Sequence, residues 1–289
     1  MQQLKQNLTS CIADVQRLRK STVLVLAASN LDMEMLPPLY RHLEALGKCD
    51  TLDVVLHGRG GVVNAARRIA LLLRAYCNKL NFIVPYYCES AATVLALAGD
   101  TIVAGNMAIF SPIDPQLHGG SGDTASTMSS LDVKYFTQMS QEWFGVPSDT
   151  TANEALSALC SSIFPPTLTA FYRTTKEMMQ VAQEMLSFQF DDSQADVRTQ
   201  IAETLMFNYH SHNYAISVHE LKALGLNCVT DDAALTAAWL ISEQVQACIG
   251  GSLRSHQDDP WYDVMLASSA EISVRQQRMD GLMPAWVSL

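Results

Sequence analysis

Short apolar runs alternate with longer amphipathic segments through the first hundred residues, and this alternation limits the possible folds more than any other feature. It predicts buried strands at residues 22–28, 52–56 and 82–85, with helices at 37–46 and 62–76 between them. Strands and helices that alternate at this spacing form βαβ units and a parallel sheet with right-handed crossovers. The sequence therefore predicts an α/β fold whose functional groups lie at the carboxyl ends of the strands.

The second half of the chain is predicted to be mostly helical. Helical patterns occur at residues 131–144, 153–162, 165–188, 193–208 and 231–249. The tail from residue 250 shows only weak patterning. The fold class expected from these patterns is a βα core followed by a helical C-terminal half.

No long linker or internal repeat divides the 289 residues. We expect an N-terminal helix in residues 1–20, one domain over residues 21–230, and a C-terminal helical extension of that domain over residues 231–289. In the first segment the apolar residues Leu4, Leu8, Ile12, Val15 and Leu18 recur at helical spacing. A helix of this kind packs on the fold or joins subunits.

The composition excludes several classes of protein. With 19 basic and 29 acidic residues the net charge is −10, which argues against non-specific binding to nucleic acid or to an anionic membrane. No apolar run is long enough to span a membrane, and the N-terminal residues lack an apolar signal core. The seven cysteines are scattered without metal-binding spacing. We therefore expect a cytoplasmic protein with reduced thiols, no metal and no cofactor.

Ser90 stands at the junction between a predicted strand and the small-residue helix 91–98. At such a junction the hydroxyl lies beside the unpaired N–H groups of the first helical turn, where the helix dipole favours negative charge. This is where an acyl-transfer enzyme needs its nucleophile. The alternative is a structural role, since serine is a favoured helix N-cap.

A second feature suited to acyl transfer is the pair Gly60 and Gly61, which follows a strand. Glycine lets a backbone N–H point into a cavity with no Cβ in the way. Acyl transfer needs two N–H donors at the developing oxyanion, and Gly61 and Ala91 are the candidates. The alternative is an ordinary tight turn. The spacing matches no nucleotide-binding motif.

A serine nucleophile also needs a base within hydrogen-bond reach. His212 precedes a helix that opens with a capping box, and it is the main candidate among the histidines. His57 in the glycine turn is a site residue or a strand cap. Lys134 and Lys176 are alternative bases, although both lie in helical patterns where a surface lysine is the ordinary case.

Several segments together resemble the serine dehydrogenase proteinase family, a branch of the Clp-protease/crotonase fold. LHGRGG at 56–61 is similar to the glycine turn of the family, and VPYYCESAATVLALAGDTIVAG at 84–105 to its serine segment. FSPIDPQ at 110–116 is similar to a further family signature. Three later segments, SSLDVKYF, IFPPTLTAFYR and SHNYAISVHELKALGL, follow in the order of the family. The resemblance covers about residues 20–230 and implies a ββα spiral core.

The resemblance also implies roles for individual residues. Ser90 matches the presumed nucleophile, Gly60 and Gly61 match the turn that supplies one oxyanion donor, and Ala91 would supply the other. His212 matches a histidine of the family, in the region where the Clp protease carries its acidic residue. The histidine of the Clp protease would fall near Ser111. Asp114 is then a candidate to orient the base, or simply a turn-forming residue between two prolines.

The expected function is that of a serine hydrolase, a peptidase that acts on peptides or proteins through a Ser90 acyl-enzyme. The resemblance implies a homo-oligomer. Two alternatives stay open. A crotonase-like acyl-CoA enzyme would need a basic phosphate site, for which Arg67 and Arg68 are the only nearby pair. A catalytically inactive assembly or scaffold protein is suggested by Glu89, whose carboxylate would oppose an oxyanion unless it pairs with Arg59.

Overall fold

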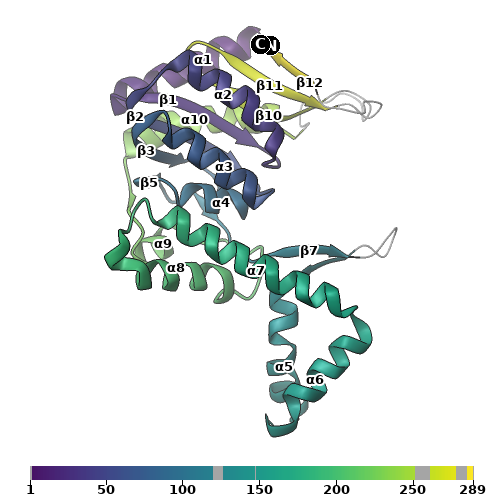
Figure 1. The fold of residues 1–289 in the computed structure, drawn as a ribbon. Coiled ribbons are helices and arrows are strands. Elements are labelled where there is room, and N and C mark those ends of the chain that lie inside the picture. The colour runs from purple at the N-terminus through teal and green to yellow at the C-terminus, as the bar shows by residue number, and fades with distance from the viewer. Residues whose placement is uncertain (1, 120–125, 147, 251–260, 278–284, 289) are drawn as a thin grey trace.

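The computed structural model describes residues 2–119, 126–146, 148–250, 261–277 and 285–288. One large sheet forms the centre of the molecule and helices cover its two faces (Figure 1). The predicted α/β class is confirmed.

The core of the sheet is parallel, as the alternation of strands and helices predicts. Its strands are β1 (Thr22–Ala28), β2 (Cys49–Gly58), β3 (Cys77–Val84), β5 (Thr101–Ala104) and β9 (Cys228–Val229), in that spatial order. Two short strands form a second parallel pair beside the end of β2. These strands are β4 (Tyr87–Cys88) and β6 (Ile109–Phe110).

Both faces of the central strands are buried. Along β1, Leu24 and Leu26 pack into the cluster with α2 (Leu36–Leu46), α3 (Val63–Arg74) and α4 (Ala91–Ala96). Val23 and Val25 of the same strand point to the opposite face, where they pack with α1 (Gln2–Arg19) and α10 (Asp232–Cys248). Strands buried on both faces appear in the sequence as continuous apolar runs, which explains why these runs were recognisable.

The predicted helix at the N-terminus is present, and its apolar face is used within the chain. Leu8, Ile12 and Val15 are fully buried against residues of α10. This face is therefore not available to join subunits.

The C-terminal segment differs from the expected helical extension over residues 231–289. Helix α10 agrees with the prediction, but it is followed by three antiparallel strands, β10 (Trp261–Ala267), β11 (Ile272–Gln277) and β12 (Ala285–Ser288). They extend the sheet beyond β1. The apolar pattern is interrupted because Asp263 and Arg275 are both buried, and their side chains form an ion pair at 2.7 Å.

The chain between β6 and β9 is mostly helical, as expected. Its helices are α5 (Ser130–Phe144), α6 (Ser148–Ser162), α7 (Pro165–Leu186), α8 (Ala195–Phe207) and α9 (Val218–Ala223). A hairpin of β7 (Gln116–Gly119) and β8 (Ser126–Ser129) precedes them. Short 3-10 turns occur at Met33–Met35 and Asp192–Gln194.

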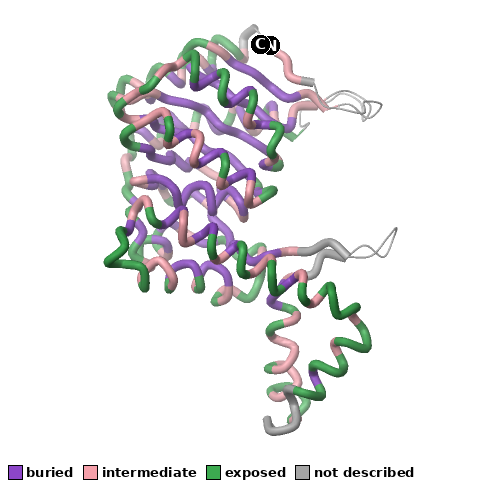
Figure 2. Tube along the Cα trace, in the orientation of Figure 1, coloured by how far each residue is buried: buried purple, intermediate pink, exposed green. Residues whose placement is uncertain are grey.

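Helices α5, α6 and the beginning of α7 project away from the body of the molecule (Figure 1). We call this projection the helical arm. Figure 2 shows that its residues are mostly exposed or half-buried, whereas the sheet is buried. The arm therefore has little core of its own.

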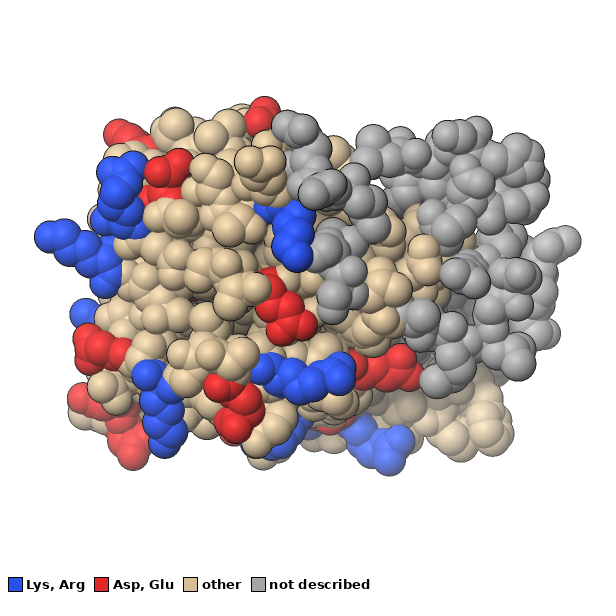
Figure 3. Space-filling view, turned by 90° about the horizontal axis from the view of Figure 1, so that it is seen from above, with Lys and Arg blue, Asp and Glu red and all other residues tan. Residues whose placement is uncertain are grey.

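The surface carries charges of both signs. On the face seen in Figure 3, lysine and arginine side chains are interspersed with aspartate and glutamate side chains. None of the helices among the described residues combines the length and the apolar character needed to cross a membrane.

Candidate active site

Ser90 occupies the N-cap position of α4, yet its hydroxyl makes no capping hydrogen bond. The side chain of Ser90 therefore does not cap the helix, which was the structural alternative for this residue. Its backbone has φ 52° and ψ −119°, a conformation that side-chain-bearing residues rarely adopt. Such strain costs on the order of 1–3 kcal/mol and persists where the surroundings enforce it, often at functional sites.

Contacts from a neighbouring strand hold this turn in place. The backbone N–H of Ser90 donates to the Oγ of Ser111 at 2.7 Å. The hydroxyl of Thr93 donates to the carbonyl of Cys88 at 2.6 Å and accepts from the N–H of Ser111 at 3.3 Å. These bonds fix both ends of the strained turn to the residue that follows β6.

The glycine turn approaches Ser90 closely. A Cβ on Gly60 would lie 3.0 Å from the Cβ of Ser90, and a Cβ on Gly61 would lie 2.3 Å from the backbone nitrogen of Leu31. Both glycines also have positive φ, 119° and 130°. Only glycine fits both requirements. Within the part of the chain that the structure describes, the N–H groups of Gly61 and Ala91 donate to no acceptor.

His212 and Asp114, which are 98 residues apart in the sequence, form a hydrogen-bonded pair. The Nδ1 of His212 lies 2.7 Å from one carboxylate oxygen of Asp114, and the Oγ of Ser129 donates to the other at 2.5 Å. Asp114 is buried. Burial alone would raise its pKa, but the hydrogen bonds from His212, Ser129 and Gln116 outweigh it and lower the pKa.

This pairing fixes the proton on the histidine. An ionised carboxylate can only accept, so Nδ1 of His212 carries the hydrogen and Nε2 of the neutral ring keeps its lone pair. The carboxylate of Asp114 thus accepts a hydrogen bond from His212. It does not serve to form the turn between the two prolines, which was the alternative.

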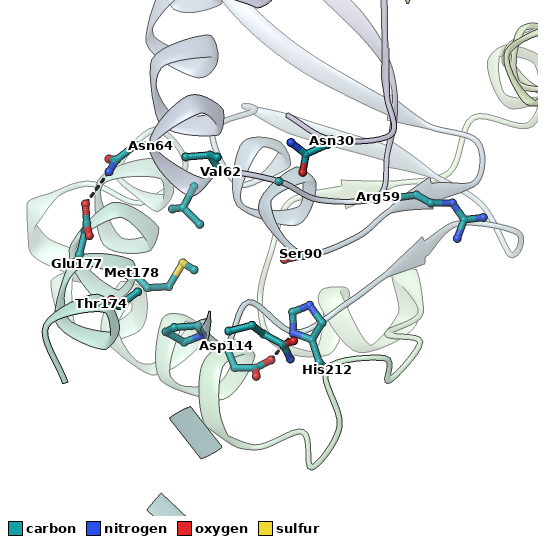
Figure 4. Close-up of a pocket in the computed structure, with 14 residues that line it drawn as sticks. Asn30, Arg59, Val62, Asn64, Ser90, Asp114, Thr174, Glu177, Met178 and His212 are labelled. Carbon is teal, nitrogen blue, oxygen red and sulfur yellow. Dashed lines mark hydrogen bonds and ion pairs between the residues drawn. The ribbon is translucent and has the colours of Figure 1, made fainter. Parts of the chain in front are cut away.

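One pocket of about 520 Å³ brings these groups together. Ser90, Gly61, Asp114 and His212 line it, and the His212 ring lies beside the Asp114 carboxylate on the side of Ser90 (Figure 4). The remaining wall comes from α3, α7, the loop after β1, the turn after β2 and the two residues that follow Asp114. A hydroxyl, a base with its carboxylate and a free backbone donor around one cavity are the parts that acyl transfer requires.

Glu89 does not line this pocket. Its carboxylate lies 3.8 Å from the guanidinium of Arg59, which stacks 3.7 Å from the ring centroid of Tyr87. Burial raises the pKa of Glu89, while the charges of Arg59 and His212 act in the opposite direction. The pairing with Arg59 that the sequence suggested is present.

The two alternative lysines are not among the residues that line the Ser90 pocket. The ammonium of Lys134 lies 3.8 Å from the ring centroid of Phe207, and that of Lys176 lies 5.6 Å from the ring centroid of Tyr172. Each ammonium group therefore lies near an aromatic ring, and neither lines the cavity that contains Ser90. The buried His57 lines a separate cavity, and burial lowers its pKa to about 4.

The paired arginines that would support an acyl-CoA enzyme are also placed elsewhere. Arg67 makes two hydrogen bonds, at 2.5 and 2.7 Å, to the carboxylate of Glu184 on α7. Neither Arg67 nor Arg68 lines the pocket. The pair therefore offers no phosphate site at the glycine turn.

Sequence reasoning missed several contributors to the site. Ser111 follows β6, and Ser129 ends β8 and caps α5; neither position indicates that the side chain also holds Ser90 or Asp114. Asn30, Asn64 and Glu177 line the pocket from three separate segments. Only the fold brings these segments together, so no local pattern could have identified these residues.

The family model of ClpP-like SDH-type serine proteinases matches residues 1–144 of this chain. The matched residues include the glycine turn, Ser90 and Asp114, but not His212.

Two relatives are uncharacterized proteins of Methanocaldococcus jannaschii. One is 24% identical over 234 residues, which are 76% of this chain and 71% of the relative. The other is 26% identical over 193 residues, which are 67% of this chain and 58% of the relative. The chain thus spans less than two thirds of the second relative.

Solved structures with similar folds have low sequence identity. The membrane-bound stomatin-specific protease 1510-N, in complex with a substrate peptide, is 12% identical with a TM-score of 0.45, over 74% of this chain and 76% of that one. ClpP1 from Listeria monocytogenes is 13% identical with a TM-score of 0.38, over 76% and 98%. An enoyl-CoA hydratase from Polaromonas is 14% identical with a TM-score of 0.34, over 79% and 76%.

Proposed function

We propose that this chain, which belongs to the ClpP-like SDH-type serine proteinase family through residues 1–144, is a serine peptidase with Ser90 as its nucleophile. The family resemblance predicted from the sequence is confirmed over residues 1–144, and it supports a peptidase at the level of the family. The observation that carries the assignment to these residues is the strained, uncapped Ser90 in a pocket shared with the His212–Asp114 pair.

In the proposed reaction, the Oγ of Ser90 attacks the carbonyl carbon of a peptide bond and its proton passes to Nε2 of His212. The N–H groups of Gly61 and Ala91 stabilise the oxyanion. The C–N bond then breaks, and the leaving amine takes the proton from His212. Water, deprotonated by the same nitrogen, hydrolyses the acyl ester and restores Ser90. Asp114 holds His212 in the required tautomer.

A fluorophosphonate probe tests this proposal, because it reacts with activated serines. We expect the wild-type protein to be labelled, with the probe found by mass spectrometry on the peptide that contains Ser90. A well-folded wild type with no label on Ser90 would contradict the proposal and favour the inactive scaffold.

Glu89 gives a separate prediction. Removing a carboxylate near a developing negative charge lowers the barrier by about 1 kcal/mol at intermediate dielectric, which is about fivefold in rate. We therefore expect Glu89→Gln to raise the rate of Ser90 labelling about two- to fivefold at pH 7. If the rate instead falls tenfold or more, Glu89 takes part in the chemistry and the scheme above is incomplete.

We also propose that the protein assembles with copies of itself through the helical arm. Trp143, Phe144 and Phe164 in the arm are 77%, 71% and 72% exposed. Large aromatic residues so exposed on one projection are typical of an interface. The N-terminal helix, whose apolar face is already buried, does not serve this purpose.

Sedimentation velocity tests the assembly. We expect the wild type to sediment as an oligomer and the double variant Phe144→Glu/Phe164→Glu to shift toward the monomer, since two buried carboxylates would destabilise the interface. The matched control is Met107→Glu, which adds a charge at an exposed apolar residue of the body and should not change the distribution. A monomeric wild type would refute the interface.

A further inference from the structure

The end of the Ser90 pocket farthest from Arg59 carries a carboxylate with no cationic partner. Glu177 of α7 lines the pocket, and its carboxylate accepts a hydrogen bond of 2.6 Å from the side-chain amide of Asn64 on α3. No lysine, arginine or histidine among the described residues forms an ion pair with Glu177.

A neighbouring contact between α3 and α7 includes the cation that Glu177 lacks. One turn farther along α3, Arg67 forms an ion pair with Glu184 of α7. At the pocket the corresponding position on α3 is the neutral Asn64. The chain thus supplies a cation to Glu184 but only an amide to Glu177.

The other charges that line the pocket are already used. Both oxygens of Asp114 accept hydrogen bonds, from His212 and Ser129. Arg59 pairs with Glu89 and lies over Tyr87, at the opposite end from Glu177 in Figure 4. Glu177 is therefore the charge that remains available to a bound molecule.

We infer that the cavity between α3 and α7 receives a lysine or arginine side chain of the substrate, adjacent to the cleaved bond, and that Glu177 is the residue that selects it. This inference rests on the proposed peptidase function. Val62 and Met178, which line the space between Ser90 and Glu177, would pack on the methylene stem, while the cation would reach the carboxylate. Asn64 holds that carboxylate in place.

Phosphonate probes that differ in one side chain test the inference. Peptidyl diphenyl phosphonates with lysine, norleucine or glutamate beside the phosphorus form the same bond with an activated serine. Because Glu177 is exposed, an ion pair there has a modest effect, and we expect the lysine probe to label Ser90 about fivefold faster than the norleucine probe. The glutamate probe should be the slowest.

Glu177→Gln keeps an acceptor for Asn64 and removes the charge. We expect it to abolish the preference for lysine over norleucine while the plain fluorophosphonate still labels Ser90. The control Glu203→Gln makes the same change of charge at an exposed residue of α8 and should keep the preference.

The outcomes separate the two proposals. If the plain probe labels Ser90 but wild type shows no lysine preference, or if the preference survives in Glu177→Gln, the inference about Glu177 is overturned and the peptidase stands. If the plain probe leaves Ser90 unlabelled, the proposed function fails and this inference fails with it.

Discussion

Ser90→Ala is expected to abolish fluorophosphonate labelling and to lower any peptidase activity by on the order of 10⁴-fold or more. Ser90 is the serine that lines the pocket beside His212, and loss of a nucleophile that acts together with its base removes nearly all of the chemistry. The exposed Ser187, whose hydroxyl bonds within its own helix, is the matched control: Ser187→Ala should retain full labelling.

The strain at Ser90 makes a second measurement informative. Glycine adopts positive φ without cost, so Ser90→Gly is expected to be inactive but more stable than wild type, by about 1 kcal/mol in the free energy of unfolding. Urea denaturation measures this. A stable, inactive Ser90→Gly would show that the chain maintains an unfavourable backbone conformation at the position where it needs the hydroxyl.

The labelling of Ser90→Ala decides the identity of the nucleophile. If Ser90→Ala keeps its label, another residue is the nucleophile and the proposed mechanism is wrong.

The core of the fold could be predicted because its signals are local. Strand β1 is buried on both faces, so its residues from Val23 to Ala28 form a continuous apolar run, and the buried end of β3 from Phe82 to Val84 does the same. The three C-terminal strands were missed because a buried ion pair, Asp263 with Arg275, breaks the apolar pattern. A charge in the sequence does not reveal that its partner lies in the neighbouring strand.

Part of the candidate site could also be predicted from local signals, and part could not. Ser90 and the two glycines are marked by their place after strands, and the structure shows that their backbones require special geometry. The pairing of His212 with Asp114 spans 98 residues, and only the path of the chain creates it.

The resemblance to the Clp protease carried one further difficulty. It places the acidic residue of that protease near His212 and the histidine near Ser111. In this chain the carboxylate comes from Asp114 in the turn after β6, and the imidazole comes from the segment before α9. The resemblance alone did not place a histidine beside a carboxylate in these two segments. The pairing of His212 with Asp114 is seen only in the structure.

His212→Ala is the second substitution with a large expected effect. Without a base, proton transfer from Ser90 is lost, and we expect the labelling rate to fall about 10²- to 10⁴-fold. His210→Ala is the matched control, because His210 is exposed two residues away and does not line the pocket, so its labelling should equal that of wild type. Lys134→Ala and Lys176→Ala should also label normally. Loss of label in a lysine variant with retention in His212→Ala would transfer the role of base to that lysine.

Asp114→Asn separates the orienting carboxylate from the base itself. We expect labelling to fall by a factor similar to that of His212→Ala, since an amide no longer holds Nδ1–H and the tautomer is lost. The two losses should not multiply in the double variant, because both residues act as one unit.

The stability of the Asp114→Asn variant gives an independent readout. The folded pKa of Asp114 is lowered, so its stabilising effect is present above the unfolded pKa of about 3.9 and is lost as pH falls through the folded value. Urea denaturation should therefore show Asp114→Asn less stable than wild type at pH 7, with the difference shrinking below about pH 4. A difference that stays constant across this range would mean that the pKa of Asp114 is the same in the folded and the unfolded protein, and that the pairing of an ionised Asp114 with His212 is wrong.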